Sequence, residues 1–314
     1  MLCRICSSGT TLAFTRQVLA TYDCKYYFCD NCGALQTEEP YWLDEAYASP
    51  IAAADTTMLW RNQYLARAMS VLLYFFFDRH GRFLDAAGGY GVFTRLMRDI
   101  GFDYYWTDKH SPNLTAQGFE ADAGPGPPYT VVTAFEVLEH LTDPVGFVAE
   151  LLETTGTDTI VFTTEIFDGG PPPPEEWMYY AFATGQHITF YQKSTCEFIG
   201  RQFGLQFHTS KTRWWQLGGM GLHIWTRAKI NPVAWRLLAS PRITGRVHGE
   251  SQSTRGDFMA ISWPLGPQED IGVGPHAGFQ RASRKPLEQA GDARGGEQPP
   301  RHGIDLGPRP DVQT

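Results

Sequence analysis

The stretch "FLDAAGGYGVFTRL" (residues 83–96) decides the fold. An apolar run ends on an acid, Asp85, and three glycines follow within six residues, before a segment with helical periodicity. Glycine lets the chain turn sharply and lets a ligand rest on bare backbone. The N-terminus of the following helix favours negative charge. The stretch therefore predicts a strand, a ligand-binding loop and a helix in succession, against the simpler alternative of a tight turn with a capping acid.

Strand-like and helix-like segments alternate on both sides of this stretch. Apolar, β-rich runs predict strands at 82–87, 103–108, 129–137, 158–167, 205–215 and 221–228. Helical spacing of apolar residues predicts helices within 41–77 and at 92–101, 143–156 and 193–204. This rhythm is typical of an α/β fold, in which a mostly parallel sheet is covered by helices on both faces.

The glycine loop matches neither of two common phosphate-binding motifs. A dinucleotide fingerprint needs a third glycine where Thr94 stands, and the phosphate loop G-x-x-x-x-G-K-[ST] is absent. Seventeen residues after Gly91, Asp108 closes the next predicted strand. A carboxylate there can accept hydrogen bonds from both hydroxyls of a ribose, which favours a nucleoside ligand.

Four cysteines near the N-terminus have the spacing of a metal site. Cys3 and Cys6 are separated from Cys29 and Cys32 by 22 residues, so that each pair is a C-x2-C turn. Two such turns present four thiolates, which complete a tetrahedron around Zn²⁺. Cys24 is predicted to lie on a strand outside the site. Free thiols or disulfides are the alternatives.

Four motifs in order carry a family resemblance over roughly residues 80–228. They are "DAAGGYG" (85–91), "TDKH" (107–110), "EADAG" (120–124) and "VVTAFEVLEHLTDP" (131–144). Together they resemble the class I S-adenosylmethionine-dependent methyltransferases. The resemblance implies a Rossmann-like, mostly parallel seven-stranded sheet and a cofactor, S-adenosylmethionine, bound at the glycine loop. It places the ribose at Asp108, the adenine amine at Asp122, and Ala87 where the family has its usual first glycine. The full set that it implies for the cofactor is Asp85, Ala87, Gly88, Gly89, Gly91, Asp108, Lys109, Asp122, Ala123 and Phe135.

The cysteine module also resembles a known one. It is similar to the zinc-binding domain that precedes the methyltransferase domain in nucleotide-sugar C-methyltransferases, and to a four-cysteine module of some ribosomal RNA methyltransferases. The resemblance implies a zinc ribbon that captures substrate, without choosing which substrate.

Candidate catalytic residues follow two of the predicted strands. The motif "EVLEH" places Glu136, Glu139 and His140 after one strand, and His187 follows the next. In one hypothesis His140 or His187 is a general base, and a tyrosine orients the substrate. In the other, the two glutamates and two histidines bind a divalent ion, as in the similar E-x-x-E-H set of small RNA 2′-O-methyltransferases and a ubiquinone-pathway O-methyltransferase. Either His187 or Glu139 can also be purely structural. The candidate tyrosines are Tyr179, Tyr180 and Tyr191.

Composition excludes several classes of protein. The net charge of −8 argues against a generally nucleic-acid-binding surface, and residues 1–40 contain only Arg4, Arg16 and Lys25 as bases. The apolar stretch 69–77 is too short to cross a bilayer. No signal peptide is evident, so we expect a cytoplasmic protein without a membrane partner.

The sequence therefore predicts an enzyme that methylates a small hydroxylated molecule, such as a sugar or glycan precursor. An RNA methyltransferase guided by the zinc ribbon and a non-catalytic zinc-ribbon adaptor are the alternatives. The sequence leaves the oligomeric state open. We expect a zinc ribbon at 1–40, a helical linker or lid at 41–80, the methyltransferase domain at 81–230, an extension at 231–264 and a disordered tail at 265–314.

Overall fold

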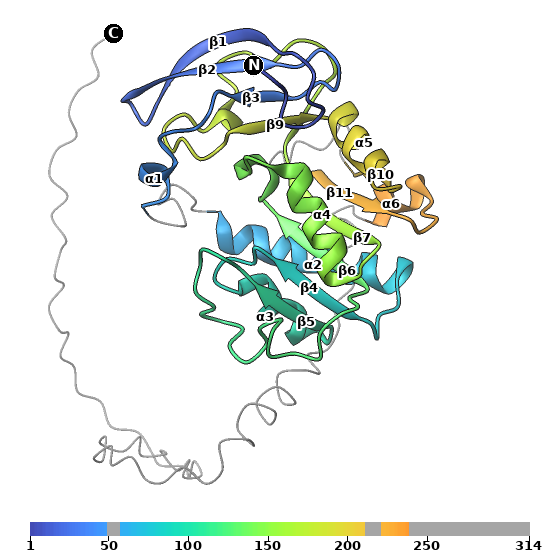
Figure 1. The fold of residues 1–314 in the computed structure, drawn as a ribbon. Coiled ribbons are helices and arrows are strands. Elements are labelled where there is room, and N and C mark those ends of the chain that lie inside the picture. The colour runs from blue at the N-terminus through green and yellow to red at the C-terminus, as the bar shows by residue number, and fades with distance from the viewer. Residues whose placement is uncertain (49–56, 211–220, 239–314) are drawn as a thin grey trace, which may run out of the picture. The chain divides into compact units, whose positions relative to one another are not determined.

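The computed structural model describes residues 1–48, 57–210 and 221–238 (Figure 1). The larger of its two sheets has six strands in the order β10-β11-β7-β6-β4-β5. Their bounds are β4 Arg82–Ala86, β5 Asp103–Thr107, β6 Val131–Phe135, β7 Thr159–Thr164, β10 Gln206–Thr209 and β11 Gly221–Thr226. The strands predicted from the apolar runs are all present within the described residues.

The larger sheet is mostly parallel, as predicted. β4 pairs in parallel with β5 and β6, and β6 with β7, whereas β11 runs antiparallel to both β7 and β10. The predicted count of seven strands is wrong for the described residues. Beyond β5, the seventh position holds only an isolated parallel bridge between Trp106 and Glu120. The residues after Glu120, "ADAGPGPPY", contain three prolines and two glycines, which do not sustain a strand ladder.

Side chains that point alternately to the two faces of the sheet divide the core into two layers. Phe83 and Val131 pack with the helices on one face, and their neighbours Leu84 and Val132 pack on the other. Successive side chains of a strand point to opposite faces, so both faces of the sheet are covered. The first face holds α2 Met58–Phe76, α3 Val92–Ile100 and α6 Pro232–Leu238, and the second holds α4 Pro144–Thr155 and α5 Lys193–Gln202.

Helix ends follow the local sequence signals. Asp143 is the N-cap of α4 and accepts a hydrogen bond from the Gly146 amide, and Pro144 occupies the first turn. Gly156 ends the helix in the left-handed conformation. The predicted helix within 41–77 is divided: α1 spans Leu43–Ala46 and α2 begins at Met58.

A second sheet joins the N-terminal module to the rest of the chain. Its order is β1-β2-β3-β9-β8, with β1 Thr11–Val18, β2 Tyr22–Phe28, β3 Leu35–Thr37, β8 Ile166–Phe167 and β9 Thr189–Gln192. β3 pairs antiparallel with β9, a strand about 150 residues later in the chain (Figure 1). The N-terminal module therefore shares its hydrogen-bonded sheet with the segment that follows His187.

Several predictions concern residues outside the described ranges, including the tail at 265–314 and most of the extension at 231–264. Of the helices described, none is both long and apolar enough to cross a membrane.

Candidate functional site

The glycine loop lies at the carboxyl end of β4, where α/β sheets bind ligands. Gly88 is crowded, because a methyl group there would lie 2.6 Å from Asp85 Oδ2 and 2.7 Å from Trp106. Gly89 has positive φ and nothing within 4 Å of the place where a side chain would start. Ala87 also has positive φ, +54°, a conformation that favours glycine. The loop thus offers bare backbone to open space at Gly89.

The acid before the glycines is buried beneath the loop. The two oxygens of Asp85 accept hydrogen bonds from the hydroxyls of Thr94 and Thr133, each at 3.1 Å. Burial raises the pKa of Asp85 to about 7, an effect that these two hydrogen bonds oppose. Asp85 therefore supports the loop from below, and a cation above the loop would favour its ionised form.

Asp108 lies beside the loop at the end of β5. Its Oδ2 accepts from the Gly89 amide at 2.9 Å, and its Oδ1 accepts from the amides of His110 and Ser111 at 2.7 and 2.8 Å. A carboxylate has about four acceptor positions, so one is left for a ribose hydroxyl. Of the two acids assigned to the nucleoside, Asp108 touches the loop, while Asp122 is exposed on the turn at 121–124.

The remaining residues predicted to bind the cofactor have different surroundings in the structure. Lys109 pairs with Glu150 at 2.9 Å on the surface. Ala123 is exposed on the same turn as Asp122. Phe135 ends β6 and packs edge-on against Phe93 of α3, with ring centroids 4.8 Å apart. Gly91, with φ of +81°, is the N-cap of α3.

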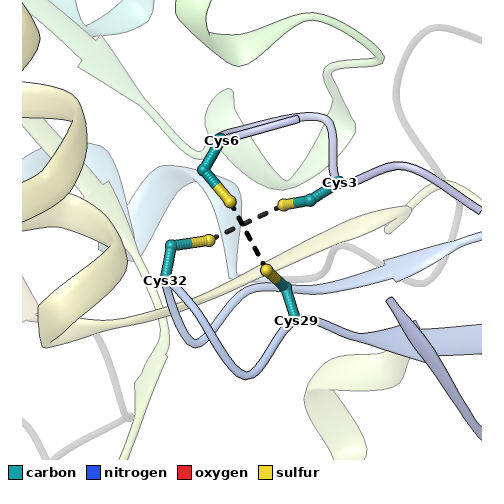
Figure 2. A group of neighbouring side chains, drawn as sticks. All are labelled: Cys3, Cys6, Cys29 and Cys32. Atoms are coloured by element: carbon teal, nitrogen blue, oxygen red, sulfur yellow. Dashed lines mark hydrogen bonds between the residues drawn. The ribbon is translucent and has the colours of Figure 1, made fainter. Parts of the chain in front are cut away.

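The four cysteines meet in one cluster (Figure 2). Cys3 and Cys32 bring their Sγ atoms within 3.6 Å, and Cys6 and Cys29 within 3.4 Å. Tetrahedral zinc with Zn–S bonds of about 2.3 Å would hold its sulfurs about 3.8 Å apart, so the cluster fits a zinc site. The Cys32 thiol lowers the pKa of Cys3 to about 5 by hydrogen bonding. Cys24 lies outside the cluster, as predicted.

A second cluster lies after β6 and contains a buried acid. Glu139, His140 and His187 bring one ligand atom each within 4.8 Å of one another. Glu139 lies in a short 3-10 helix, Leu138–His140, and its side chain is 0% exposed. Neither of its carboxylate oxygens has a hydrogen-bond partner. A buried polar group without partners is costly, so a cation beside this acid would stabilise it.

The two histidines of this cluster are held by backbone carbonyls. His187 Nδ1 lies 2.6 Å from Tyr179 O, and His140 Nδ1 lies 3.1 Å from Gln186 O. A carbonyl only accepts, so the bond to Tyr179 O places a proton on Nδ1 of His187, whereas His140 Nδ1 is shared between Gln186 O and the hydroxyl of Tyr47. None of the described hydrogen bonds reaches the Nε2 atom of either ring. Such carbonyl contacts are typical of histidines that ligate metals.

The protonation of His140 argues against its acting as a base on its own. Burial lowers the pKa of His140 to about 4, although Glu139 beside it raises that pKa. A base with so low a pKa takes up a proton weakly near neutral pH. The histidine is therefore better suited to ligating a cation as a neutral imidazole.

Three other predicted catalytic residues lie outside the second cluster. Glu136 has positive φ, +54°, and its amide donates to Thr163 Oγ1, but it is not among the clustered ligand atoms. Tyr180 donates its hydroxyl to Pro173 O and Tyr191 to Leu138 O, and both rings are buried. The hydroxyls of both tyrosines are therefore bonded to backbone carbonyls rather than free.

Sequence reasoning missed Tyr47. Its hydroxyl lies 2.9 Å from His140 Nδ1, across 93 residues of sequence. The segment that carries it is fixed on the site, since Gln186 donates to Ala46 O and Trp42 to Gly185 O, each at 2.8 Å. No local pattern marks Tyr47, because its partner is distant in the chain.

Comparison with known proteins places the glycine loop and the second cluster in one domain. The family described as "Methyltransferase domain" matches residues 59–210, a range that contains both the glycine loop and the second cluster. No curated protein matches the sequence.

Several solved structures match part of the chain at low sequence identity. A methyltransferase of calicheamicin biosynthesis, in its SAH-bound form, is 14% identical over 55% of each chain, with a TM-score of 0.40. Human N-acetylserotonin methyltransferase in complex with SAM is 16% identical over 60% of this chain and 66% of its own, with a TM-score of 0.40. Mitomycin 7-O-methyltransferase is 11% identical over 60% of each chain, with a TM-score of 0.39. The aligned region spans about half the length of the first of these proteins.

Proposed function

We propose that this S-adenosylmethionine-dependent methyltransferase transfers the methyl group to a hydroxyl of a small molecule, with a sugar or glycan precursor as the expected class. The observation that supports this most is the cluster of Glu139, His140 and His187, which follows β6 and β7 at the same edge of the sheet as the glycine loop. The cluster offers acceptor atoms that have no partner within the described protein.

A hydroxyl needs such a cluster because it is a poor nucleophile until its proton is removed. The buried Glu139 and one ring nitrogen from each histidine would hold a divalent cation, which would satisfy the unpaired carboxylate. When bound, such a cation lowers the pKa of a coordinated hydroxyl. Glu139 then supplies the negative charge, and Gln186 O and Tyr179 O keep the imidazoles oriented.

We assign the remaining predicted site residues either to binding the cofactor or to binding zinc in the cysteine module. We assign the methionine and ribose parts of the cofactor to the loop at 85–91 and Asp108, and the adenine to the turn containing Asp122. We assign one structural zinc to Cys3, Cys6, Cys29 and Cys32. Four cysteines that bind zinc as thiolates must stay reduced, as they do in a reducing compartment, and this supports a cytoplasmic location.

An RNA acceptor is the second candidate, and charge argues against it. The net charge is −8, and the cysteine module carries only three bases. Proteins that bind nucleic acid through its phosphates present clustered Lys and Arg.

The test supplies S-adenosylmethionine with a deuterated methyl group to the purified protein, together with fractionated small-molecule extracts or total RNA. Mass spectrometry then locates the label. We expect the label on an oxygen of a small hydroxylated molecule, and the Glu139→Gln protein should not produce it. Label on RNA alone would favour the second candidate, and label on nitrogen or carbon would contradict hydroxyl methylation.

A further inference from the structure

Arg4 connects the cysteine module to the second cluster. It lies between Cys3 and Cys6, and its guanidinium reaches across to β9. Nη1 donates to Ile188 O at 2.8 Å and to Thr189 Oγ1 at 3.3 Å. Nη2 donates to Glu38 O at 2.9 Å and to Thr37 Oγ1 at 3.3 Å. One side chain therefore bonds two strands of the second sheet at once.

The charge of Arg4 is held by neutral acceptors. Among the described residues, no carboxylate forms an ion pair with it. Burial lowers the pKa of Arg4, and the largest opposing effect is the negative charge of Glu39, which raises that pKa. Arginine has a planar set of donors, and a guanidinium bound to two carbonyls in this way fixes their relative positions.

One of those carbonyls belongs to the residue after His187. Ile188 donates its amide to Glu139 O at 2.8 Å and gives its carbonyl to Arg4. Thr189, the next residue, donates its hydroxyl to Leu141 O at 3.0 Å. Arg4 thus holds Ile188, the residue after His187, beside Glu38, while Ile188 itself is bonded to the short helix that contains Glu139 and His140.

The second cysteine pair holds the other end of β9. Cys32 O accepts from Thr195 Oγ1 at 2.8 Å and from Ser194 Oγ at 3.1 Å, at the start of α5. The two cysteine turns therefore hold the strand after His187 at both of its ends. A metal that joins the two turns sets the distance between these contacts.

We propose that the cysteine module acts on the methyl-transfer site through Arg4, a positioning residue that sets the place of His187 relative to Glu139. Zinc in the module is then coupled to the order of the second cluster. The proposal rests on the proposed function for the chemistry of that cluster, but its geometry can be tested without any turnover.

The test compares the zinc-loaded wild-type, Arg4→Gln and Arg4→Lys proteins by NMR of ¹⁵N-labelled histidine side chains. The probe is the Nδ1 proton of His187, which is bonded to Tyr179 O at 2.6 Å and can be assigned with His187→Gln. His223 is an internal control, since it is fully buried and bonded to Thr209 and Thr164. Arg16→Gln is a matched control, because Arg16 lies in the same module but pairs on the surface with Glu175.

We expect Arg4→Gln to shift or broaden the His187 resonance while the His223 resonance, the zinc content and the affinity for S-adenosylmethionine are retained. Arg4→Lys keeps the charge and one donor group, so its shift should be smaller, and Arg16→Gln should cause none. An unmoved His187 resonance in a folded, zinc-loaded Arg4 variant would overturn the proposal, as would an equal change at His223.

A Mn²⁺ titration followed by electron paramagnetic resonance separates this proposal from the proposed function. Residues that orient metal ligands typically contribute 10–100-fold to metal affinity. Arg4→Gln should therefore weaken Mn²⁺ binding at least about tenfold. If the wild-type protein binds no Mn²⁺ although Arg4→Gln moves His187, the cation hypothesis fails and the positioning role of Arg4 stands.

Discussion

Replacing Glu139 by glutamine tests whether the second cluster holds a divalent cation. The side chain is 0% exposed and neither carboxylate oxygen has a hydrogen bond. Burying a polar group without a hydrogen bond costs about 1–3 kcal/mol in proteins, and an uncompensated charge costs more. Glu139→Gln removes the charge but leaves an uncharged polar group in the same place, so in the cation-free protein the variant should be at least as stable as the wild type.

Added cation should reverse this order. A ligand present at about 100 times its dissociation constant stabilises the folded state by about 2.7 kcal/mol. For a domain of this size, 1 kcal/mol shifts the melting temperature by about 2–4 °C, so Mn²⁺ should raise that of the wild type by about 5–10 °C. The Glu139→Gln protein lacks the charged ligand, so Mn²⁺ should raise its melting temperature by much less.

Thermal denaturation of the zinc-loaded protein, with and without MnCl₂, measures both effects. Glu153→Gln is a control, because Glu153 is an exposed acid on α4. Equal responses of the wild type and Glu139→Gln to Mn²⁺ would refute the reasoning, and so would a wild type that does not respond.

Four further predictions follow from the loop and the module. Gly89→Ala should abolish S-adenosylmethionine binding in calorimetry while the protein stays folded, since the new methyl group enters open space over the loop; unchanged affinity would remove the loop from the binding site. Asp108→Ala should weaken binding of S-adenosylmethionine by roughly 1–3 kcal/mol, for the one hydrogen bond lost to the ribose, and equal affinity in calorimetry would exclude this role. The folded-state pKa of Asp85 is raised from 3.8 to about 7, so its ionisation destabilises the fold as pH rises from about 4 to 7. In denaturant unfolding, the free energy of unfolding of Asp85→Asn should therefore increase relative to that of the wild type over this range, by a few kcal/mol at most. A difference in unfolding free energy that does not change with pH would contradict the raised pKa. Elemental analysis should find about one zinc per chain, lost in Cys29→Ser but retained in Cys24→Ser, whereas full zinc in Cys29→Ser would refute the assignment.

The parts of the fold that could be predicted are those with short-range signals. The loop between β4 and α3 follows from glycines whose conformation is local, and the cap of α4 follows from Asp143 and Pro144. The cysteine cluster follows from spacing, because two C-x2-C turns suit one metal. The seventh strand was expected from the family resemblance and is reduced to a single bridge, since the residues after Glu120 interrupt a ladder.

The parts that could not be predicted depend on contacts distant in sequence. Nothing near Leu35 indicates that its strand pairs with Phe190. Tyr191 has the residue type expected of a substrate ligand, but the register of β9 directs its hydroxyl to Leu138 O. Tyr47 reaches His140 only because the segment before α2 folds back over the site. Such partners are set by tertiary packing, which local patterns do not encode.

The most direct test of the central claim is the rate of methyl transfer to the isolated acceptor at saturating S-adenosylmethionine, compared between wild type and Glu139→Gln. If the cluster of Glu139, His140 and His187 removes the proton from the acceptor hydroxyl, the variant should be slower by roughly a hundredfold or more. Its affinity for S-adenosylmethionine, measured by calorimetry, should be unchanged. Turnover of the variant close to that of the wild type would contradict the claim and would place the chemistry elsewhere in the domain.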